Sequence, residues 1–243
     1  MRRRFFVDRV RNGHAEIEGE DARHLTRVLR VEAGQRYEIS DNLHVYLAEI
    51  ETARKERVVF RTLEKVEIPP PAVRIILLAA LIKFDRFEWI VEKATELGVA
   101  EIVPVEAARS ERGLDRAAHK RLERWRRIAL EASQQARRAQ LPEIREPVVF
   151  EAATSEQAQY RYVLDEGFPG GALAAALPTV CQSGDSVAIL TGPEGGWTDQ
   201  EREGFATLGW TRVSLGPLIL RAETAAMAAL AVVRQHWLAK MTS

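Results

Sequence analysis

Hydrophobic positions in residues 72–243 follow two alternating patterns, which predict strands and helices in succession. A continuous apolar run at 75–81 is typical of a strand buried on both faces. In 84–97 the apolar residues recur at helical spacing, and Gly98 ends that predicted helix. Further strands are predicted at 102–105, 162–164, 187–190 and 213–215, and further helices at 115–139, 171–177, after 198, and at 225–233. This alternation predicts an α/β domain with a parallel sheet.

Residues 1–71 have a different pattern, with short segments of β character separated by turns. One helical segment, 22–30, interrupts them. The β segments are Phe5–Val7, Tyr37–Ser40, Val45–Ile50 and Val58–Leu63. The pattern predicts a small β-barrel with one helix. Three successive prolines at 69–71 form a stiff spacer, so we predict two domains, 1–71 and 72–243.

Two apolar runs near the carboxyl terminus each break into a Gly/Pro loop and restart as a helix. They are Leu190–Asp199 and Leu215–Ala225. Thr198 or Asp199 can cap the first helix, and Glu223 or Thr224 opens the second. Ligands of open α/β sheets bind at the carboxyl ends of strands. The two loops therefore predict a small-molecule pocket made largely of backbone.

The first loop has glycines at 192, 195 and 196, which allow close backbone approach or positive φ. A phosphate loop is disfavoured, because no Gly-Lys-Ser/Thr ending follows and Glu194 would place a carboxylate against the phosphate. The dinucleotide fingerprint is also absent. A cationic or zwitterionic ligand fits better. The alternative is a tight strand–helix turn without a ligand.

Arg221 precedes a segment, 225–233, that is apolar all round and therefore predicted to be buried in the core or in a subunit interface. An arginine at such a place needs a partner. Either Arg221 pairs with Glu223, or it faces an electron-rich oxygen of a substrate.

Charge is distributed unevenly, although the formal net charge is zero. Residues 109–145 carry 11 basic and 5 acidic side chains, whereas 146–243 carry 6 and 11. The basic block is either a solvated helix face or a surface for a phosphate backbone, and its arginine content favours RNA. In the first domain His24, Arg27 and Arg30 add further groups that could contact RNA.

One cysteine, Cys181, excludes an internal disulfide and fits a reducing cytoplasm. The amino terminus lacks the apolar region of a signal peptide, and no apolar run reaches membrane-spanning length. The other four histidines have no partner at metal or catalytic spacing, so no metal is expected.

Several segments together resemble the SPOUT methyltransferases, and among them the family that methylates the N(3) position of one uridine in small-subunit ribosomal RNA. The resemblance covers nearly the whole chain. It rests on Leu190–Trp197, Leu215–Ala225, Lys83 with Phe87–Val99, Trp125–Ala132, Gln134 and Gln135, Leu141–Ile144, and Arg23–Leu25 with Val28–Arg30. Positions 218, 84 and 23 depart from the family, where arginine, glycine and histidine are frequent.

The resemblance implies a PUA-like β-barrel at 1–71 and a SPOUT α/β domain with a C-terminal trefoil knot at 72–243. It also implies S-adenosylmethionine as cofactor, small-subunit ribosomal RNA as partner, and a homodimer built on the C-terminal helix. The expected cofactor-binding residues are Leu190, Thr191, Gly192, Glu194, Gly195, Gly196, Leu215, Gly216, Leu220, Thr224 and Ala225. The expected RNA-binding residues are Arg3, Arg4, His24, Arg27, Arg30, Lys83, Arg124, Arg127 and Arg138.

The expected catalytic residues are Arg221 and Glu223. Arg221 would stabilise the anion that develops on the uridine ring, and Glu223 or Glu194 would accept the imide proton or orient the sulfonium. Two alternatives stay open at this point. The chain could be a non-catalytic RNA-binding assembly protein, or a SPOUT enzyme with another RNA target.

Overall fold

The computed structural model describes residues 3–111, 113–168 and 170–241. The chain forms two compact units. One contains Met1–Pro69 together with Ser133–Leu141, and the other contains Pro70–Ala132 and Pro142–Ser243. The first break falls at the run of prolines. The predicted domain boundary at residue 71 did not anticipate that a segment from the middle of the chain would pack with the amino-terminal unit.

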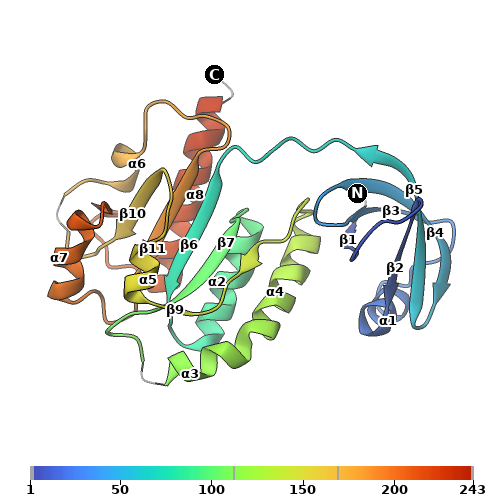
Figure 1. Cartoon of the computed structure of the whole chain (residues 1–243), viewed down its shortest axis with the longest axis horizontal. Coiled ribbons are helices and arrows are strands. Elements are labelled where there is room, and N and C mark those ends of the chain that lie inside the picture. Colours follow the sequence, from blue (N-terminus) through green and yellow to red (C-terminus); the bar gives the residue numbers. More distant parts are fainter. Residues whose placement is uncertain (1–2, 112, 169, 242–243) are drawn as a thin grey trace. The chain divides into compact units, whose positions relative to one another are not determined.

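The first unit is a curled five-stranded sheet with one helix (Figure 1). Its strand order is β1-β3-β4-β5-β2, in which β1 runs parallel to β3 and the other pairs are antiparallel. The elements are β1 (Arg4–Phe6), β2 (His14–Glu18), α1 (Gly19–Arg27), β3 (Arg36–Ser40), β4 (Val45–Arg54) and β5 (Arg57–Val66). Apolar residues of these strands, including Phe5, Ile39 and Phe60, fill its core. The sequence analysis missed β2, although its residues alternate between exposed and buried.

An arginine–glutamate cluster fastens the 133–141 segment inside the first unit. Arg4 donates a hydrogen bond to the backbone carbonyl of Arg137 at 2.6 Å, and both guanidinium groups bind the Glu38 carboxylate. Burial raises the pKa of Glu38, but the hydrogen bonds and charges of Arg4 and Arg137 outweigh burial and leave this pKa below its ordinary value. Ser40 adds a hydrogen bond to the carbonyl of Ala139 at 2.6 Å.

The second unit is a parallel α/β sheet with strand order β12-β10-β11-β6-β7-β8, and β9 also pairs with β7. Helices cover both faces (Figure 1). The strands are β6 (Arg74–Ala80), β7 (Glu101–Glu106), β8 (Glu143–Ile144), β9 (Val148–Val149), β10 (Tyr160–Leu164), β11 (Ser186–Thr191) and β12 (Thr211–Val213). The helices are α2 (Phe84–Glu96), α3 (Leu114–Ala118), α4 (Leu122–Gln135), α5 (Phe150–Thr154), α6 (Leu173–Ala176), α7 (Asp199–Thr207) and α8 (Ala222–Met241).

Each face of this sheet has its own core. Apolar residues of α2, α4 and α8, such as Phe87, Trp125 and Trp237, pack on one face. Trp197, Phe205 of α7 and Ala153 of α5 pack on the other. The strand interiors are apolar on both sides for this reason, as the continuous run at 75–81 predicted.

Several predicted elements differ in detail. The single helix expected at 115–139 is divided into α3 and α4 by a 3-10 turn at His119–Arg121. Helix α8 is longer than its apolar segment, because polar residues continue it to Met241. The short α5 was not predicted. The trefoil knot stays a prediction. Among the described residues no helix combines the length and apolarity needed to cross a membrane.

Candidate functional site

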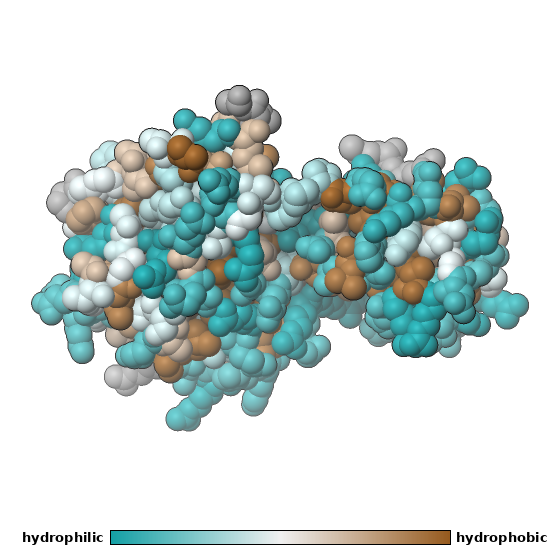
Figure 2. All heavy atoms as spheres, turned by 45° about the horizontal axis from the view of Figure 1, so that its top comes forward, coloured by the Kyte–Doolittle hydropathy of each residue, from teal (hydrophilic) through white to brown (hydrophobic). Residues whose placement is uncertain are grey.

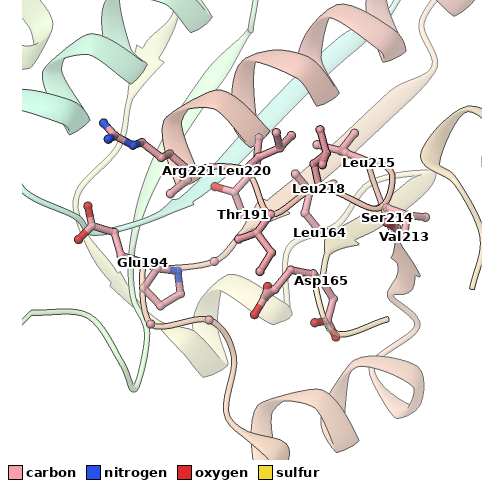
Figure 3. A pocket seen from close by; sticks show the side chains of 18 of the residues that line it. Leu164, Asp165, Thr191, Glu194, Val213, Ser214, Leu215, Leu218, Leu220 and Arg221 are labelled. Atoms are coloured by element: carbon pink, nitrogen blue, oxygen red, sulfur yellow. The ribbon is translucent and has the colours of Figure 1, made fainter. Parts of the chain in front are cut away.

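A cavity of about 490 Å³ opens at the carboxyl ends of three neighbouring strands of the second unit (Figure 3). The last residue of each strand lines it: Leu164 of β10, Thr191 of β11 and Val213 of β12. The loops that follow these strands form most of the wall, and Arg86 of α2 completes it. This volume is ordinary for a small-molecule site. The prediction of a backbone-walled pocket is confirmed in its location.

Two glycines of the loop after β11 lie where a β-carbon would crowd neighbouring side chains. A β-carbon on Gly192 would lie 3.0 Å from the ring of Trp197. A β-carbon on Gly196, where φ is +66°, would lie 2.3 Å from a carboxylate oxygen of Glu166. The buried indole of Trp197 donates a hydrogen bond to the Leu164 carbonyl at 2.8 Å. The loop therefore packs closely against the end of β10.

Helix α7 begins at a capping box formed by Thr198, which is one of the two predicted cap residues. The Thr198 hydroxyl accepts from the backbone N–H of Glu201 at 3.2 Å, and the Glu201 carboxylate accepts from the Thr198 N–H at 2.7 Å. The other oxygen of Glu201 accepts from the N–H of Ala108 at 3.0 Å. This helix start is thus fixed both locally and to the segment after β7.

The loop after β12 brings Arg221 to the cavity. Arg221, which was predicted to be catalytic, lines the wall together with Leu215, Gly216, Leu220 and Ala225, which were predicted to bind the cofactor. The Arg221 side chain is exposed and makes no hydrogen bond or ion pair with the residues that the structure describes. The alternative of an Arg221–Glu223 pair is therefore not observed. In Figure 3 the side chains of Arg221 and Glu194 lie on the same side of the cavity.

Three predicted residues lie away from the cavity wall. Leu190 is fully buried in the core of the sheet, and Thr224 is exposed on α8. Glu223 lies in the first turn of α8, and its Oε2 atom is buried without a hydrogen-bond partner among the described residues. The structure thus brings Arg221 and Glu194 together at the cavity but leaves Glu223 outside its lining.

Leu164, Asp165 and Glu166 form a third wall of the cavity, which was not predicted from the sequence. The Asp165 side chain is fully buried and binds two arginines, with 2.7 Å to Nη2 of Arg212 and 3.2 Å to Nε of Arg202. Arg202 also pairs with Glu166 at 3.3 Å. The sequence did contain a signal for this wall. An apolar strand is followed there by Asp-Glu-Gly, just as the two predicted loops each follow an apolar run and contain glycine.

Arg86 was missed as well, because only tertiary structure brings the first turn of α2 to this cavity. It forms an ion pair with Glu194, 108 residues away. Charged groups of both signs therefore stand at the cavity. Among the described residues no group of three or more His, Cys, Asp or Glu side chains is placed to hold a metal ion.

The residues predicted to bind RNA differ in accessibility. Arg3, His24, Arg27 and Arg30 are exposed on the first unit, and Lys83 is exposed at the start of α2. Arg4 is the exception: its side chain is only 6% exposed and is used in the Glu38 cluster. Arg138 is half-buried, and its Nε donates to the Gln140 carbonyl at 3.0 Å.

The positive charges of the basic block on α4 have more acidic partners than the sequence of this block indicates. Glu88 of α2 pairs with Arg121 at 3.4 Å and with Arg124 at 2.6 Å, and Arg127 pairs with Glu131 at 3.3 Å. The count of acidic residues within 109–145 does not include Glu88, which comes from another helix. Arg124 and Arg127 nevertheless keep exposed side chains. The face in Figure 2 is mostly hydrophilic, with small scattered apolar patches.

Comparison with known families gives two matches. Residues 69–234 match the RNA methyltransferase domain, and residues 17–63 match the RNA methyltransferase PUA domain. The ribosomal RNA small subunit methyltransferase E of Bacillus subtilis is 30% identical over 95% of this chain and 95% of its own length. The protein of that name from Synechocystis is 34% identical over 86% of this chain and 69% of its own length.

Solved structures agree. The ribosomal RNA small subunit methyltransferase E of Neisseria gonorrhoeae, crystallised with S-adenosylmethionine, superposes with a TM-score of 0.86 at 27% identity and covers 98% of both chains. A protein of Legionella pneumophila with bound S-adenosylmethionine gives a TM-score of 0.87 at 29% identity, covering 97% of this chain and 98% of its own.

Proposed function

We propose, since the chain belongs to the ribosomal RNA small subunit methyltransferase E family, that it transfers a methyl group from S-adenosylmethionine to the N(3) atom of one uridine in 16S ribosomal RNA. The observation that carries this proposal is the cavity walled by three strand-end loops. On its wall lies the guanidinium of Arg221, which has no partner among the described residues. The coarser activity, RNA methylation, follows from the family.

The cavity's composition fits S-adenosylmethionine. Leu215, Leu218 and Leu220 offer apolar surface for a heterocycle, and Gly192 and Gly196 leave room against the backbone. The carboxylates of Glu166 and Glu194, each paired with an arginine, and the guanidinium of Arg221 give the wall charges of both signs, which suit a zwitterionic ligand. When bound, S-adenosylmethionine supplies a methyl group activated by its sulfonium. Two structurally similar proteins crystallised with this cofactor support the assignment.

Arg221 is the proposed stabiliser of the substrate anion. The imide nitrogen of uridine carries a proton at neutral pH and becomes a good nucleophile only as that proton leaves. Negative charge then spreads to the flanking ring oxygens. A guanidinium without another partner can donate to such an oxygen, and this interaction strengthens as the charge develops.

Two carboxylates of this chain are candidates to accept the imide proton. Glu194 lines the cavity but is ion-paired with Arg86. Glu223 has a buried oxygen that lacks a hydrogen-bond partner among the described residues, and it follows Ala222, which lines the cavity. We propose Glu223 for this role, because its carboxylate oxygen is not already used by a guanidinium.

We further propose that RNA contacts the exposed cations Arg3, His24, Arg27, Arg30, Lys83, Arg124 and Arg127, and also the half-buried Arg138. Arg4 is left out because it is buried. The target base must leave any stack to reach the cavity. A homodimer through α8, a trefoil knot around the cofactor loops, and action in the cytoplasm are parts of the same proposal.

The decisive experiment combines labelled methyl transfer with mapping of the product. The protein is incubated with radiolabelled S-adenosylmethionine and either naked 16S RNA or small subunits that lack the modification, and the labelled nucleotide is identified by mass spectrometry. N(3)-methyluridine is the expected product. A methyl group on another atom would overturn the finer proposal, and RNA binding without transfer on either substrate would favour the non-catalytic assembly protein.

A further inference from the structure

Two arginines from distant parts of the chain hold the loop after β11, residues 192–197. Arg86 of α2 binds the carboxylate of Glu194. Arg109, which follows β7, donates from Nη1 to the backbone carbonyls of Gly195 at 3.0 Å and Trp197 at 3.2 Å. One arginine thus holds a side chain of the loop, and the other holds its backbone.

The loop needs such contacts because its own sequence leaves it flexible. A single backbone hydrogen bond, from Gly196 N–H to the Pro193 carbonyl at 2.9 Å, closes its turn. Glu194 and Gly195, between the buried Pro193 and Gly196, are exposed. Glycine loses more conformational entropy on ordering than any other residue. Contacts from outside the loop must therefore select the conformation that walls the cavity.

Arg86 also controls the charge on this side of the cavity. Arg221 and Glu194 lie on the same side in Figure 3, yet Glu194 pairs with Arg86 and the Arg221 side chain has no partner among the described residues. Removing Arg86 would leave the Glu194 carboxylate free to pair with Arg221.

We infer that Arg86 and Arg109 are positioning residues that clamp the 192–197 loop, and that Arg86 in addition keeps Glu194 from binding Arg221. The clamp concerns the conformation of the loop in the free protein. The role of Arg86 in keeping Glu194 from Arg221 rests on the proposed function, because that function assigns Arg221 to the substrate. Neither arginine is required to touch the cofactor.

The inference predicts different behaviour for the two arginines. Arg86→Ala should loosen the loop and also slow methyl transfer, because Glu194 captures Arg221. Adding Glu194→Gln to Arg86→Ala removes the capturing charge, so transfer should recover by about tenfold while the loop stays loose, as expected for one ionic hydrogen bond worth roughly 1.5 kcal/mol. Arg109→Ala should loosen the loop to a similar extent, but Glu194→Gln should not rescue it.

The test measures the loop and the reaction separately. Hydrogen exchange of the ligand-free protein reports the peptide that contains 193–197, where both alanine variants should exchange at least about fivefold faster than wild type. Calorimetry with S-adenosylhomocysteine reports binding, which should weaken in both variants. Arg86→Lys, which can keep the ion pair, should stay close to wild type. Arg57→Ala is the matched control, because it breaks an exposed ion pair with Glu16 in the other unit.

Each outcome has one meaning. Unchanged exchange in both alanine variants would reject the clamp, even if the protein binds the cofactor and methylates RNA. Failure of the wild type to bind S-adenosylhomocysteine would reject the proposed function, while the exchange data would still judge the clamp. Equal rescue of Arg86→Ala and Arg109→Ala by Glu194→Gln would reject the competition between Arg86 and Arg221.

Discussion

The indole N–H of Trp197 donates a hydrogen bond to the carbonyl oxygen of Leu164 at 2.8 Å, and both groups are buried. Trp197 belongs to the loop after β11, and Leu164 is the last residue of β10. The bond therefore joins two of the three strand ends that wall the cavity. A buried carbonyl that loses its donor costs about 1–3 kcal/mol, so this bond contributes to stability and to the shape of the site.

Comparing Trp197→Phe with Trp210→Phe should separate these two contributions. The substitution at Trp197 leaves the Leu164 carbonyl buried without its donor, and we expect both lower stability and weaker binding of S-adenosylhomocysteine. Trp210→Phe is the matched control, because its indole donates to the buried carbonyl of Thr154 at 2.9 Å, away from the cavity. Chemical denaturation and calorimetry measure the two effects. Equal loss of affinity in both variants would contradict a specific role for Trp197.

Gly196→Ala should impair cofactor binding more than its stability cost suggests. The positive φ costs roughly 1 kcal/mol for an L-residue, and the new methyl group would displace the Glu166 carboxylate from the cavity wall. Gly204→Ala within α7 is the control: its β-carbon would lie 3.7 Å from Leu208, and it should raise stability slightly. A Gly196→Ala protein that binds S-adenosylhomocysteine like wild type would refute the close packing described for this loop.

Arg221→Ala should slow methyl transfer by about 10²–10³-fold, the usual loss when one donor to a developing anion is removed. Cofactor affinity should change little. Single-turnover kinetics and calorimetry distinguish the two. If Arg221→Ala instead abolished S-adenosylhomocysteine binding and left the rate at saturation unchanged, Arg221 would be a cofactor ligand.

Replacing Arg124, Arg127 and Arg138 together by alanine should flatten the salt dependence of RNA binding. Each lost phosphate contact lowers the logarithmic slope by about 0.7 for single-stranded RNA, so three contacts lower it by about 2. The surface ion pairs of Arg124 and Arg127 are no obstacle, because exposed pairs contribute little stability. The control variant replaces Arg54, Lys55 and Lys65 of the β4–β5 hairpin by alanine, which changes the net charge by the same amount as the first variant. An unchanged slope in the first variant would place the RNA elsewhere.

Lowering the pH should reduce the stability of the first unit, because it protonates the Glu38 carboxylate. Its pKa in the folded protein lies below the ordinary value, so the charged carboxylate contributes stability above the unfolded-state pKa, and this contribution is lost as pH falls toward the folded-state pKa. Glu38→Gln should reduce the dependence of stability on pH below about 5. Glu123→Gln, at an exposed pair with Arg126, should not. Denaturation midpoints across pH 3–7 test this, and parallel curves for wild type and Glu38→Gln would refute it.

Much of the fold and part of the site could be predicted because they depend on local patterns. Continuous apolar runs gave the buried strands, and the Gly/Pro loops at 190–196 and 215–221 gave two walls of the cavity. Their physical basis is short-range: strand burial, helix capping and glycine backbone freedom act within a few residues. The Thr198 cap is an example, since its partner is three residues away.

Only the tertiary structure decided which charged groups are free. Arg4 binds Glu38 and the backbone carbonyl of Arg137. Arg124 pairs with Glu88, and Glu194 pairs with Arg86. Arg221, in contrast, has no side-chain partner among the described residues. These partners stand 34 to 133 residues apart in the chain. The sequence determined the succession of strands, helices and glycine loops, because those follow from local periodicity. Pairing between distant side chains depends on how the elements pack, which no local pattern encodes.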